Sequence, residues 1–261
     1  MGQRKAPALE RMVAGAFSRL GLTVMRASSI GRLLPSEATD AQRSIIDRIR
    51  PFTMTSDERI WSLLQSTRYI TERPVSGDIV ECGVWRGGSM MAAALQLLEL
   101  GAEDRHIWLY DTYEGMTPPT PEDKEAATGV TAEHLLSTTE VGDGDNVWCV
   151  ADERDVSTNL TSTGYPADRL HFIKGDVAQT LTHTKPESIA LLRLDTDWYA
   201  STKAELEFLY SRLAPCGVCI LDDYGHWEGA RKAVDEYFAS HPPRPLMMPI
   251  DYSGRIFMKP C

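Results

Sequence analysis

Short apolar segments alternate with helical segments along most of the chain after Pro74. The pattern predicts strands at 77–85, 105–113, 169–177, 189–198 and 217–223, and helices at 87–100, 201–213 and 228–241. Strands that are separated by helices pair in parallel and form a sheet covered on both faces. The sequence therefore predicts an α/β fold with a doubly wound, mostly parallel sheet and a C-terminal antiparallel hairpin at 246–260.

The length of 261 residues fits one main domain with an additional terminal segment. We expect a helical segment at 1–72 that packs on or covers the ligand site, followed by the sheet domain at 73–261. Ser56 or Asp57 is a candidate N-cap of a helix in the first segment. A polar insertion at about 114–168 shows no clear period. An insertion of this length is usually functional or disordered, so it is a candidate lid.

The formal net charge of -10 argues against a general nucleic-acid binder, because phosphate contacts need a basic surface. Residues 1–34 differ from the rest, with six Lys or Arg and one acid. Apolar residues recur there at helical spacing, so this helix could contact an anionic membrane, or pack on its own domain or a second subunit of a homo-oligomer. No apolar run is long enough for a membrane span or a signal peptide, which predicts a cytoplasmic protein.

The five cysteines are scattered and odd in number, which is not the pattern of a disulfide framework. Cys216 and Cys219 form a C-x-x-C pair. The pair lies across a turn and the start of a strand, whereas a thioredoxin-like pair opens a helix. No second pair or suitably spaced histidine accompanies it, so neither a redox site nor a zinc site is expected.

Two of the predicted strands end in pairs of acids. "LLRLDTDWY" contains Asp195 and Asp197, and "GVCILDDYGHW" contains Asp222 and Asp223. A buried ionised carboxylate is costly unless a partner compensates it. In open parallel sheets, ligands bind beyond the carboxyl ends of the strands. The four acids therefore mark a candidate site.

The loop "ECGVWRGGS" follows the first predicted strand. Its glycines, Gly83, Gly87 and Gly88, do not have the G-x-G-x-x-G spacing of a dinucleotide fingerprint. An open loop beside Glu81 suits a cationic amino-acid end, such as that of S-adenosylmethionine, better than a diphosphate. Asp111 ends the second strand 23 positions after Gly88, close to the spacing of roughly 20 found for acids that bind a ribose.

Four sequence blocks resemble the macrocin O-methyltransferase family, the TylF-like enzymes that methylate sugar hydroxyls in antibiotic pathways. The blocks are "DIVECGVWRGGS", "LYDTYEGM", "LDTDWYASTKAELEFLYSRLAPCGV" and "LDDYGHWEGARKAVDEYF". The resemblance implies a class I methyltransferase fold, S-adenosylmethionine as the methyl donor, Mg²⁺, and a sugar acceptor. It places the metal ligands on Asp195, Asp222 and Asp223. It places the cofactor contacts on Thr53, Met54, Glu81, Gly83, Trp85, Arg86, Gly87, Ser89, Asp111, Gly175 and Asp176.

Metal-assisted chemistry suits these residue types. Carboxylates without Cys or His favour a hard cation such as Mg²⁺, and coordination lowers the pKa of a bound oxygen. Asp195 is the candidate general base, with Asp197 and His226 as alternatives. Asp197 could instead cap the following helix. Four aromatic residues are a candidate sugar platform or part of the core: Trp198, Tyr199, Tyr224 and Trp227.

Two other functions are compatible with parts of the sequence. The "DTD" segment matches the D-x-D by which metal-dependent glycosyltransferases hold a nucleotide sugar. The second acid pair and the glycine loop favour methyl transfer. A non-catalytic binding module is the other alternative, although such a module would not need all of these acids.

Overall fold

A computed structural model describes residues 34–142 and 146–261 of the chain. Residues 37–261 form one compact unit. The basic helix predicted near the N-terminus lies outside the described residues. Within the described residues, no helix is both long enough and apolar enough to cross a bilayer.

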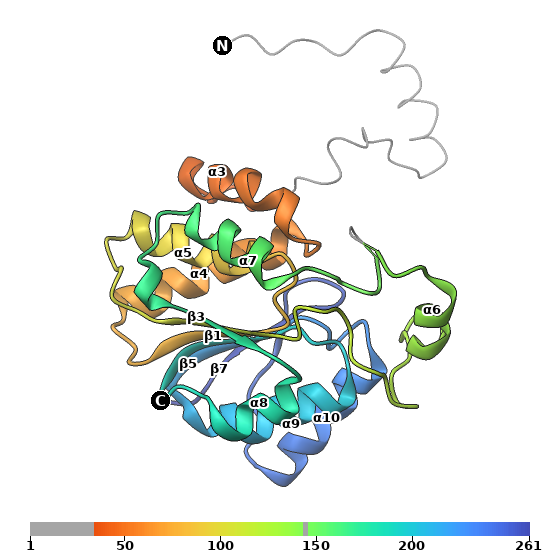
Figure 1. Cartoon of the computed structure of the whole chain (residues 1–261). Helices are drawn as coiled ribbons and strands as arrows, with labels where there is room; N and C mark the ends of the chain where they lie inside the picture. Colours follow the sequence, from red (N-terminus) through yellow and green to blue (C-terminus); the bar gives the residue numbers. More distant parts are fainter. Residues whose placement is uncertain (1–33, 143–145) are drawn as a thin grey trace, which may run out of the picture. The chain divides into compact units, whose positions relative to one another are not determined.

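The core of the unit is a seven-stranded sheet with the order β3-β2-β1-β4-β5-β7-β6 (Figure 1). The strands are β1 (Asp78–Cys82), β2 (Ile107–Asp111), β3 (Leu170–Lys174), β4 (Ile189–Leu194), β5 (Leu213–Leu221), β6 (Met248–Pro249) and β7 (Arg255–Met258). The first five strands pair in parallel, and β7 runs antiparallel to both β5 and β6. This confirms the predicted doubly wound sheet and its C-terminal hairpin.

Helices cover both faces of the sheet (Figure 1). One layer holds α3 (Asp40–Ile49), α4 (Asp57–Glu72), α5 (Gly88–Glu99) and α7 (Glu153–Thr161), and the other holds α8 (Val177–His183), α9 (Tyr199–Leu209) and α10 (Glu228–Ser240). Short 3-10 turns lie at Arg50–Phe52, Ala167–Arg169 and Tyr210–Arg212. The central strand β4 is buried along its whole length, as expected for a strand covered on both faces.

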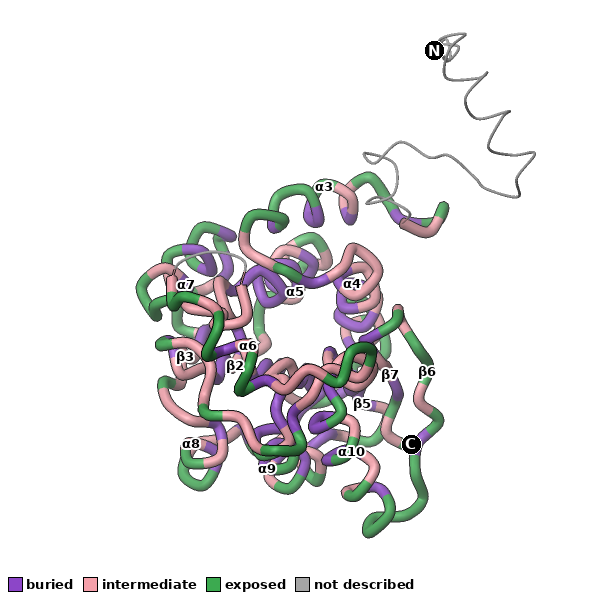
Figure 2. The backbone as a smooth tube through the Cα atoms, turned by 90° about the vertical axis from the view of Figure 1, so that its right-hand side faces the viewer, coloured by how far each residue is buried: buried purple, intermediate pink, exposed green. Residues whose placement is uncertain are grey.

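The helices before the sheet belong to the same compact unit as the sheet itself. Thr39 forms a capping box with Gln42 at the start of α3, and the Ser56 side chain caps α4. Both helices pack against α5, and α4 buries Ile60 and Leu63 in that contact layer. Figure 2 shows buried stretches along α4 and α5 and exposed residues on the outer side of α3. The segment between α3 and α4 is thereby held beside the carboxyl ends of the strands.

The insertion at 114–168 has more structure than its sequence suggested. It contains α6 (Ala132–Thr138) and α7, and it is anchored by the buried Asp123. The Asp123 carboxylate accepts a hydrogen bond from the backbone of Tyr199 at 2.7 Å, and its backbone carbonyl accepts one from Ala132 at 2.8 Å. Ala132 and Leu136 of α6 pack in a cluster with Trp198 and Trp227. The first part of the insertion is therefore fixed to the starts of α9 and α10.

One disulfide joins Cys216 at the start of β5 to Cys261, with the two Cα atoms 4.7 Å apart. Cys219, the other half of the C-x-x-C pair, is a buried free thiol. Cys216 is therefore bonded to Cys261 and not to Cys219. This disulfide was not expected from the sequence, because the scattered cysteines show no framework pattern and the two partners are 45 positions apart.

The chain just after β1 lies very close to the chain just after β4, its parallel neighbour, at Gly83. The Gly83 backbone has a φ of +81°, and a Cβ atom there would collide with the carbonyl oxygen of Asp195. Only glycine combines this conformation with so close an approach of two chains. Gly101 also has a positive φ, of +64°, but a Cβ atom there would meet nothing within 4 Å.

These two glycines provide a matched test of the close approach between the two chain segments at Gly83. We expect Gly101→Ala to lower the free energy of unfolding by about 1–2 kcal/mol, the cost of a left-handed backbone for an L-residue. Gly83→Ala should cost clearly more, because the chains must also move apart. Urea denaturation of both variants measures the difference. Equal losses would contradict the close approach at Gly83.

Candidate functional site

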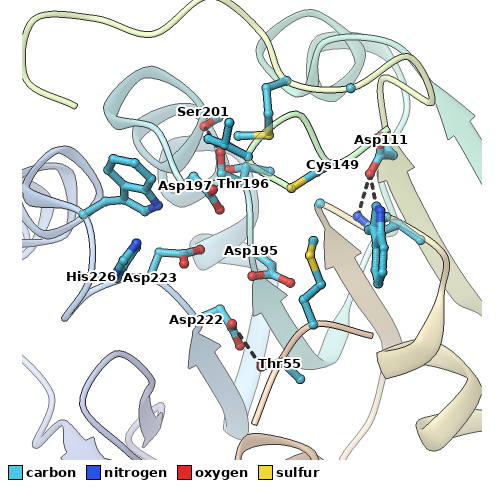
Figure 3. A pocket seen from close by; sticks show the side chains of 18 of the residues that line it. Thr55, Asp111, Cys149, Asp195, Thr196, Asp197, Ser201, Asp222, Asp223 and His226 are labelled. Carbon is cyan, nitrogen blue, oxygen red and sulfur yellow. Dashed lines mark hydrogen bonds between the residues drawn. The ribbon is translucent and has the colours of Figure 1, made fainter. Parts of the chain in front are cut away.

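A cleft with a volume of about 590 Å³ lies at the carboxyl ends of the strands (Figure 3). The segment at 52–55, the loop after β1 and the end of β2 line one part of it. The acids after β4 and β5 and the residues of the insertion line another. Eleven of the residues predicted from the sequence lie on its walls: Thr53, Met54, Gly83, Trp85, Ser89, Asp111, Gly175, Asp176, Asp195, Asp222 and Asp223. Three others, Glu81, Arg86 and Gly87, do not.

The loop after β1 is ordered by Asp111. One oxygen of its carboxylate accepts hydrogen bonds from the backbone N–H groups of Val84 at 2.7 Å and Trp85 at 3.1 Å (Figure 3). The other oxygen accepts one from the backbone N–H of Tyr113 at 2.8 Å. Burial raises the pKa of Asp111, and these backbone donors oppose the rise. Asp111 thus faces the cleft and also stabilises the loop, while its predicted ribose contact stays a prediction.

Arg86 and Gly87 support this loop from outside the cleft. The Arg86 guanidinium makes a bidentate pair with Asp155 of α7, at 2.8 and 3.1 Å. Gly87 precedes α5 with a φ of +86°. Both positions differ from the cofactor contacts expected from the sequence, because they join the loop to the helical layer.

Arg193 of β4 is buried at the centre of an ion-pair network. Its guanidinium lies 2.6 Å from Glu81 of β1, 2.5 Å from Asp195 and 2.6 Å from Asp222. Glu81 is fully buried and does not line the cleft; one of its oxygens binds Arg193, and the other has no hydrogen-bond partner. This differs from the sequence-based expectation, which placed Glu81 against the cofactor. One cation shared by three acids compensates each of them only in part.

Asp222 has a second cationic partner, Arg59 of α4. Arg59 also pairs with Asp251 at 2.9 Å, and the Thr55 hydroxyl donates to Asp222 at 3.3 Å. Burial raises the pKa of Asp222, but Arg193 and Arg59 together hold it below its ordinary value. Asp222 is therefore an ionised carboxylate whose charge is already compensated within the protein.

A second group of acids is compensated only at Asp195, by its ion pair with Arg193. Oxygen atoms of Asp195, Asp197 and Asp223 all lie within 4.8 Å of one another, and we refer to these residues as the acid cluster (Figure 3). None of the ion pairs within residues 34–142 and 146–261 includes Asp197 or Asp223. One oxygen of Asp223 is buried without a hydrogen-bond partner.

Ionisation of the acid cluster is unfavourable, as the raised pKa values of its members show. Burial, followed by the charge of Asp195, raises the pKa of Asp197 to about 7. Burial and the charge of Asp197 raise the pKa of Asp223 well above its ordinary value. A divalent cation would remove both penalties, and carboxylate oxygens are the ligands that hard cations such as Mg²⁺ prefer. The residues of this site fit such an ion.

The set of grouped acids differs in one member from the predicted metal ligands. The sequence-based set, Asp195, Asp222 and Asp223, stays a prediction, whereas the geometry brings Asp197 rather than Asp222 to the other two. Asp197 does not cap α9. The N-cap position is Trp198, and the Tyr199 N–H is satisfied by Asp123. Asp197 has a φ of +68°, a left-handed conformation at which the chain turns between β4 and α9.

His226 lines the cleft next to the acid cluster. One ring nitrogen is 3.9 Å from Glu125 of the insertion, and the other is 3.5 Å from the Tyr252 hydroxyl. Of the four aromatic residues considered as a sugar platform, only Trp227 lines the cleft. Trp198 is core, and the hydroxyls of Tyr199 and Tyr224 bind acids of α10.

Sequence reasoning missed both arginines of the site. The sequence pattern could have indicated Arg193, because a charged residue interrupts the otherwise apolar strand "IALLRL". A buried cation in such a strand needs acids on the neighbouring strands. No sequence pattern indicated Arg59, since an arginine on an amphipathic helix usually lies on the solvated face.

Known proteins resemble the chain along most of its length. The macrocin O-methyltransferase (TylF) family matches residues 39–259. The chain is 33% identical over 201 residues to 8-demethyl-8-(2,3-dimethoxy-alpha-L-rhamnosyl)-tetracenomycin-C 4'-O-methyltransferase from Streptomyces olivaceus, covering 76% of this chain and 73% of that protein. It is 30% identical over 202 residues to demethyldecarbamoylnovobiocin O-methyltransferase from Streptomyces niveus, covering 77% and 73%. The solved structure of the O-methyltransferase NovP superposes with a TM-score of 0.69 and 28% identity, covering 80% of this chain and 83% of that one.

The Arg193 network predicts a large and pH-dependent loss on removal of the guanidinium. Arg193→Met should lower the free energy of unfolding by about 3–5 kcal/mol at neutral pH, because it leaves buried acids uncompensated. Arg68→Met, which breaks the exposed pair with Glu72, is the matched control and should change little.

The pH dependence follows from the raised pKa of Glu81. Burial raises that pKa from 4.5 to about 7, so the folded state binds more protons than the unfolded state, and stability is lost as the pH rises through this interval. Without Arg193 the pKa rises further. The loss of unfolding free energy caused by Arg193→Met should therefore become smaller as the pH is lowered from about 8 to about 5. Chemical denaturation across this range measures it, and a deficit that does not depend on pH would contradict the network.

Proposed function

Because the chain belongs to the macrocin O-methyltransferase family, we propose that it transfers a methyl group from S-adenosylmethionine to a sugar hydroxyl of a glycosylated natural product, with the help of Mg²⁺. One observation carries the proposal. A single cleft contains the loop that Asp111 orders and the acid cluster, in which Asp197 and Asp223 have no cationic partner among the ion pairs of the described residues. The first suits a methyl donor, and the second suits a cation beside an acceptor hydroxyl.

The charge of the cleft supports a cationic donor over a nucleotide sugar. Among the described residues that line it, Arg59 is the one Lys or Arg, and it is already paired with Asp222 and Asp251. A diphosphate needs cations or open helix N-termini with a glycine fingerprint. The acid-rich walls instead favour the positive charge of a sulfonium and an amino group. This weighs against the metal-dependent glycosyltransferase alternative.

We infer that the acid cluster would hold the cation, with Asp195 and Asp223 common to both possible ligand sets and either Asp197 or Asp222 as the third ligand. A divalent cation supplies positive charge that lowers the pKa of an alcohol beside it. Asp195, Asp197 and Asp223 all line the cleft, as does Arg59, whereas Arg193 does not.

Asp195 is the proposed general base. Arg193 fixes one of its oxygens at 2.5 Å, so the carboxylate has a defined orientation at the end of β4. Burial raises the pKa of Asp195, so the ionised carboxylate accepts a proton readily. It would take the hydroxyl proton as the sugar oxygen attacks the methyl carbon. The loop after β1 and the segment at 52–55 would hold the donor in line, and this positioning accounts for much of the rate.

The acceptor would enter beside α6. Met116, Leu135 and Val147 of the insertion line the cleft there and pack on the cluster that contains Trp227. An apolar wall next to a polar, acidic floor suits a sugar attached to an apolar body. The two relatives described above are named for acceptors of this kind, a rhamnosyl-tetracenomycin and a novobiocin precursor.

Donor choice is tested first by ligand binding. S-adenosylhomocysteine should raise the melting temperature, since a ligand that binds only the native state stabilises it. UDP-glucose should not. Incubation with S-adenosylmethionine, Mg²⁺ and a panel of glycosylated acceptors should add one methylene by mass spectrometry. Stabilisation by the nucleotide sugar alone would overturn the proposal.

The cation is tested by chelation. EDTA should abolish turnover and leave S-adenosylhomocysteine binding intact, and added Mg²⁺ should restore the rate. Full activity in EDTA would remove the metal from the proposal.

Two variants identify the third ligand. If the acid cluster is the ligand set, Asp197→Asn should raise the Mg²⁺ concentration for half-maximal rate by at least about 10-fold. If the sequence-based set is correct, Asp222→Asn should do so instead. Asp235→Asn, which alters an acid that pairs with Arg244 outside the cleft, is the control. An unchanged Mg²⁺ requirement in both site variants would contradict both sets.

A further inference from the structure

We propose that Glu205 is a positioning residue for the acid cluster: through the Thr196 hydroxyl it fixes the turn at residues 195–197 in the geometry that binds the divalent cation. The inference rests on the proposed function, because that cation site is part of it. Glu205 does not line the cleft and does not touch the acid cluster, so it can act only through Thr196.

Glu205 lies on α9 beneath the turn and is fully buried. Thr196 lines the cleft between Asp195 and Asp197, and its hydroxyl donates a hydrogen bond to one Glu205 oxygen at 2.8 Å. The other Glu205 oxygen is buried without a hydrogen-bond partner. A half-satisfied buried acid destabilises the fold relative to an apolar side chain. Its neighbours Leu206 and Leu209 show that leucine fits this helix layer.

The turn that Glu205 supports is strained. Asp197 has a φ of +68°, an unfavourable conformation for a residue other than glycine that persists only where the surroundings impose it. Thr196 is held at two points. Its carbonyl accepts bonds from the Trp198 N–H at 2.8 Å and the Ser201 hydroxyl at 3.3 Å, and its hydroxyl is held by Glu205. Without the second point the turn can relax, and Asp195 and Asp197 would move relative to Asp223.

An acid suits this position because it is not charged. Burial raises the pKa of Glu205 to about 8, against a smaller opposing effect of the bond from Thr196. At neutral pH the side chain is mostly protonated, so it can hold Thr196 without adding negative charge to the nearby acid cluster. Outer residues that orient metal ligands in this manner typically change metal affinity or activity by about 10- to 100-fold when removed.

The test measures Mn²⁺ binding by electron paramagnetic resonance, on the full chain saturated with S-adenosylhomocysteine. Glu205→Leu and Thr196→Val each remove one half of the contact and should weaken Mn²⁺ binding by about 10- to 100-fold. Glu205→Gln keeps a hydrogen-bond acceptor and Thr196→Ser keeps a hydroxyl. Their affinities for Mn²⁺ should therefore lie within about threefold of the wild-type affinity. Glu207→Leu, on the exposed side of the same helix, is the control.

Two further measurements separate positioning from a general structural role. The affinity for S-adenosylhomocysteine in EDTA should be unchanged in every variant. The double variant Glu205→Leu/Thr196→Val should bind Mn²⁺ no more weakly than the worse single variant, because both remove the same contact. Losses of Mn²⁺ binding that add, or that accompany an equal loss of donor affinity, would overturn the inference.

The outcomes also distinguish the inference from the function on which it rests. If wild type binds Mn²⁺ and Glu205→Leu and Thr196→Val bind it equally well, the positioning role is wrong and the cation site stands. If wild type does not bind Mn²⁺ at all, the cation site itself is wrong. Should Glu205→Leu not fold, Thr196→Val decides, since Thr196 borders the cleft and leaves the helix layer intact.

Discussion

The buried Arg193 is the interaction on which the centre of the site depends. Strands β1, β4 and β5 lie side by side, and each delivers an acid to the same end of the sheet. Without a cation between them, Glu81, Asp195 and Asp222 would repel one another in a region that excludes water. Arg193 divides the acids into two groups. Glu81 and Asp222 pair with arginines, whereas none of the ion pairs of the described residues includes Asp197 or Asp223.

Much of this could be predicted from the sequence, because parallel strands bring their carboxyl ends to one edge. The strand pattern therefore placed Asp111, Asp195 and Asp223 correctly on one cleft. The sequence could not predict which acids pair with Arg193 and which group with one another. That choice depends on how far the guanidinium reaches across the strands and on the left-handed backbone at Asp197. The short helices α6 and α8 have seven residues each, too few to show a helical period. The hydrogen bond from the Tyr199 N–H at the start of α9 to Asp123 could not be predicted either, because Asp123 is distant in sequence.

The insertion is tied to the same framework rather than hinged beside it. Asp123 satisfies the start of α9, Glu125 forms an isolated bridge with Trp227, and Ala126 donates to the His226 carbonyl at 2.8 Å. The apolar wall of α6 is therefore joined by hydrogen bonds to the chain segments that follow the acids. An enzyme that selects a hydroxyl on a large acceptor needs this property, because the rate depends on how closely the reacting atoms are positioned. Changes in α6 could alter acceptor choice without disturbing the acids.

The distribution of compensated and uncompensated charge also follows the needs of methyl transfer. An acid close to the sulfonium would stabilise the donor before reaction and so oppose transfer, because only interactions that strengthen in the transition state accelerate it. On the proposed donor side, Asp111 accepts hydrogen bonds from three backbone N–H groups, which oppose the rise of its pKa on burial. On the proposed acceptor side, Asp197 and Asp223 belong to none of the ion pairs of the described residues. During the reaction the sulfonium loses its charge and the acceptor releases a proton. Negative charge is thus placed where the proton is lost, and a bound cation would keep the resting site neutral enough to remain folded.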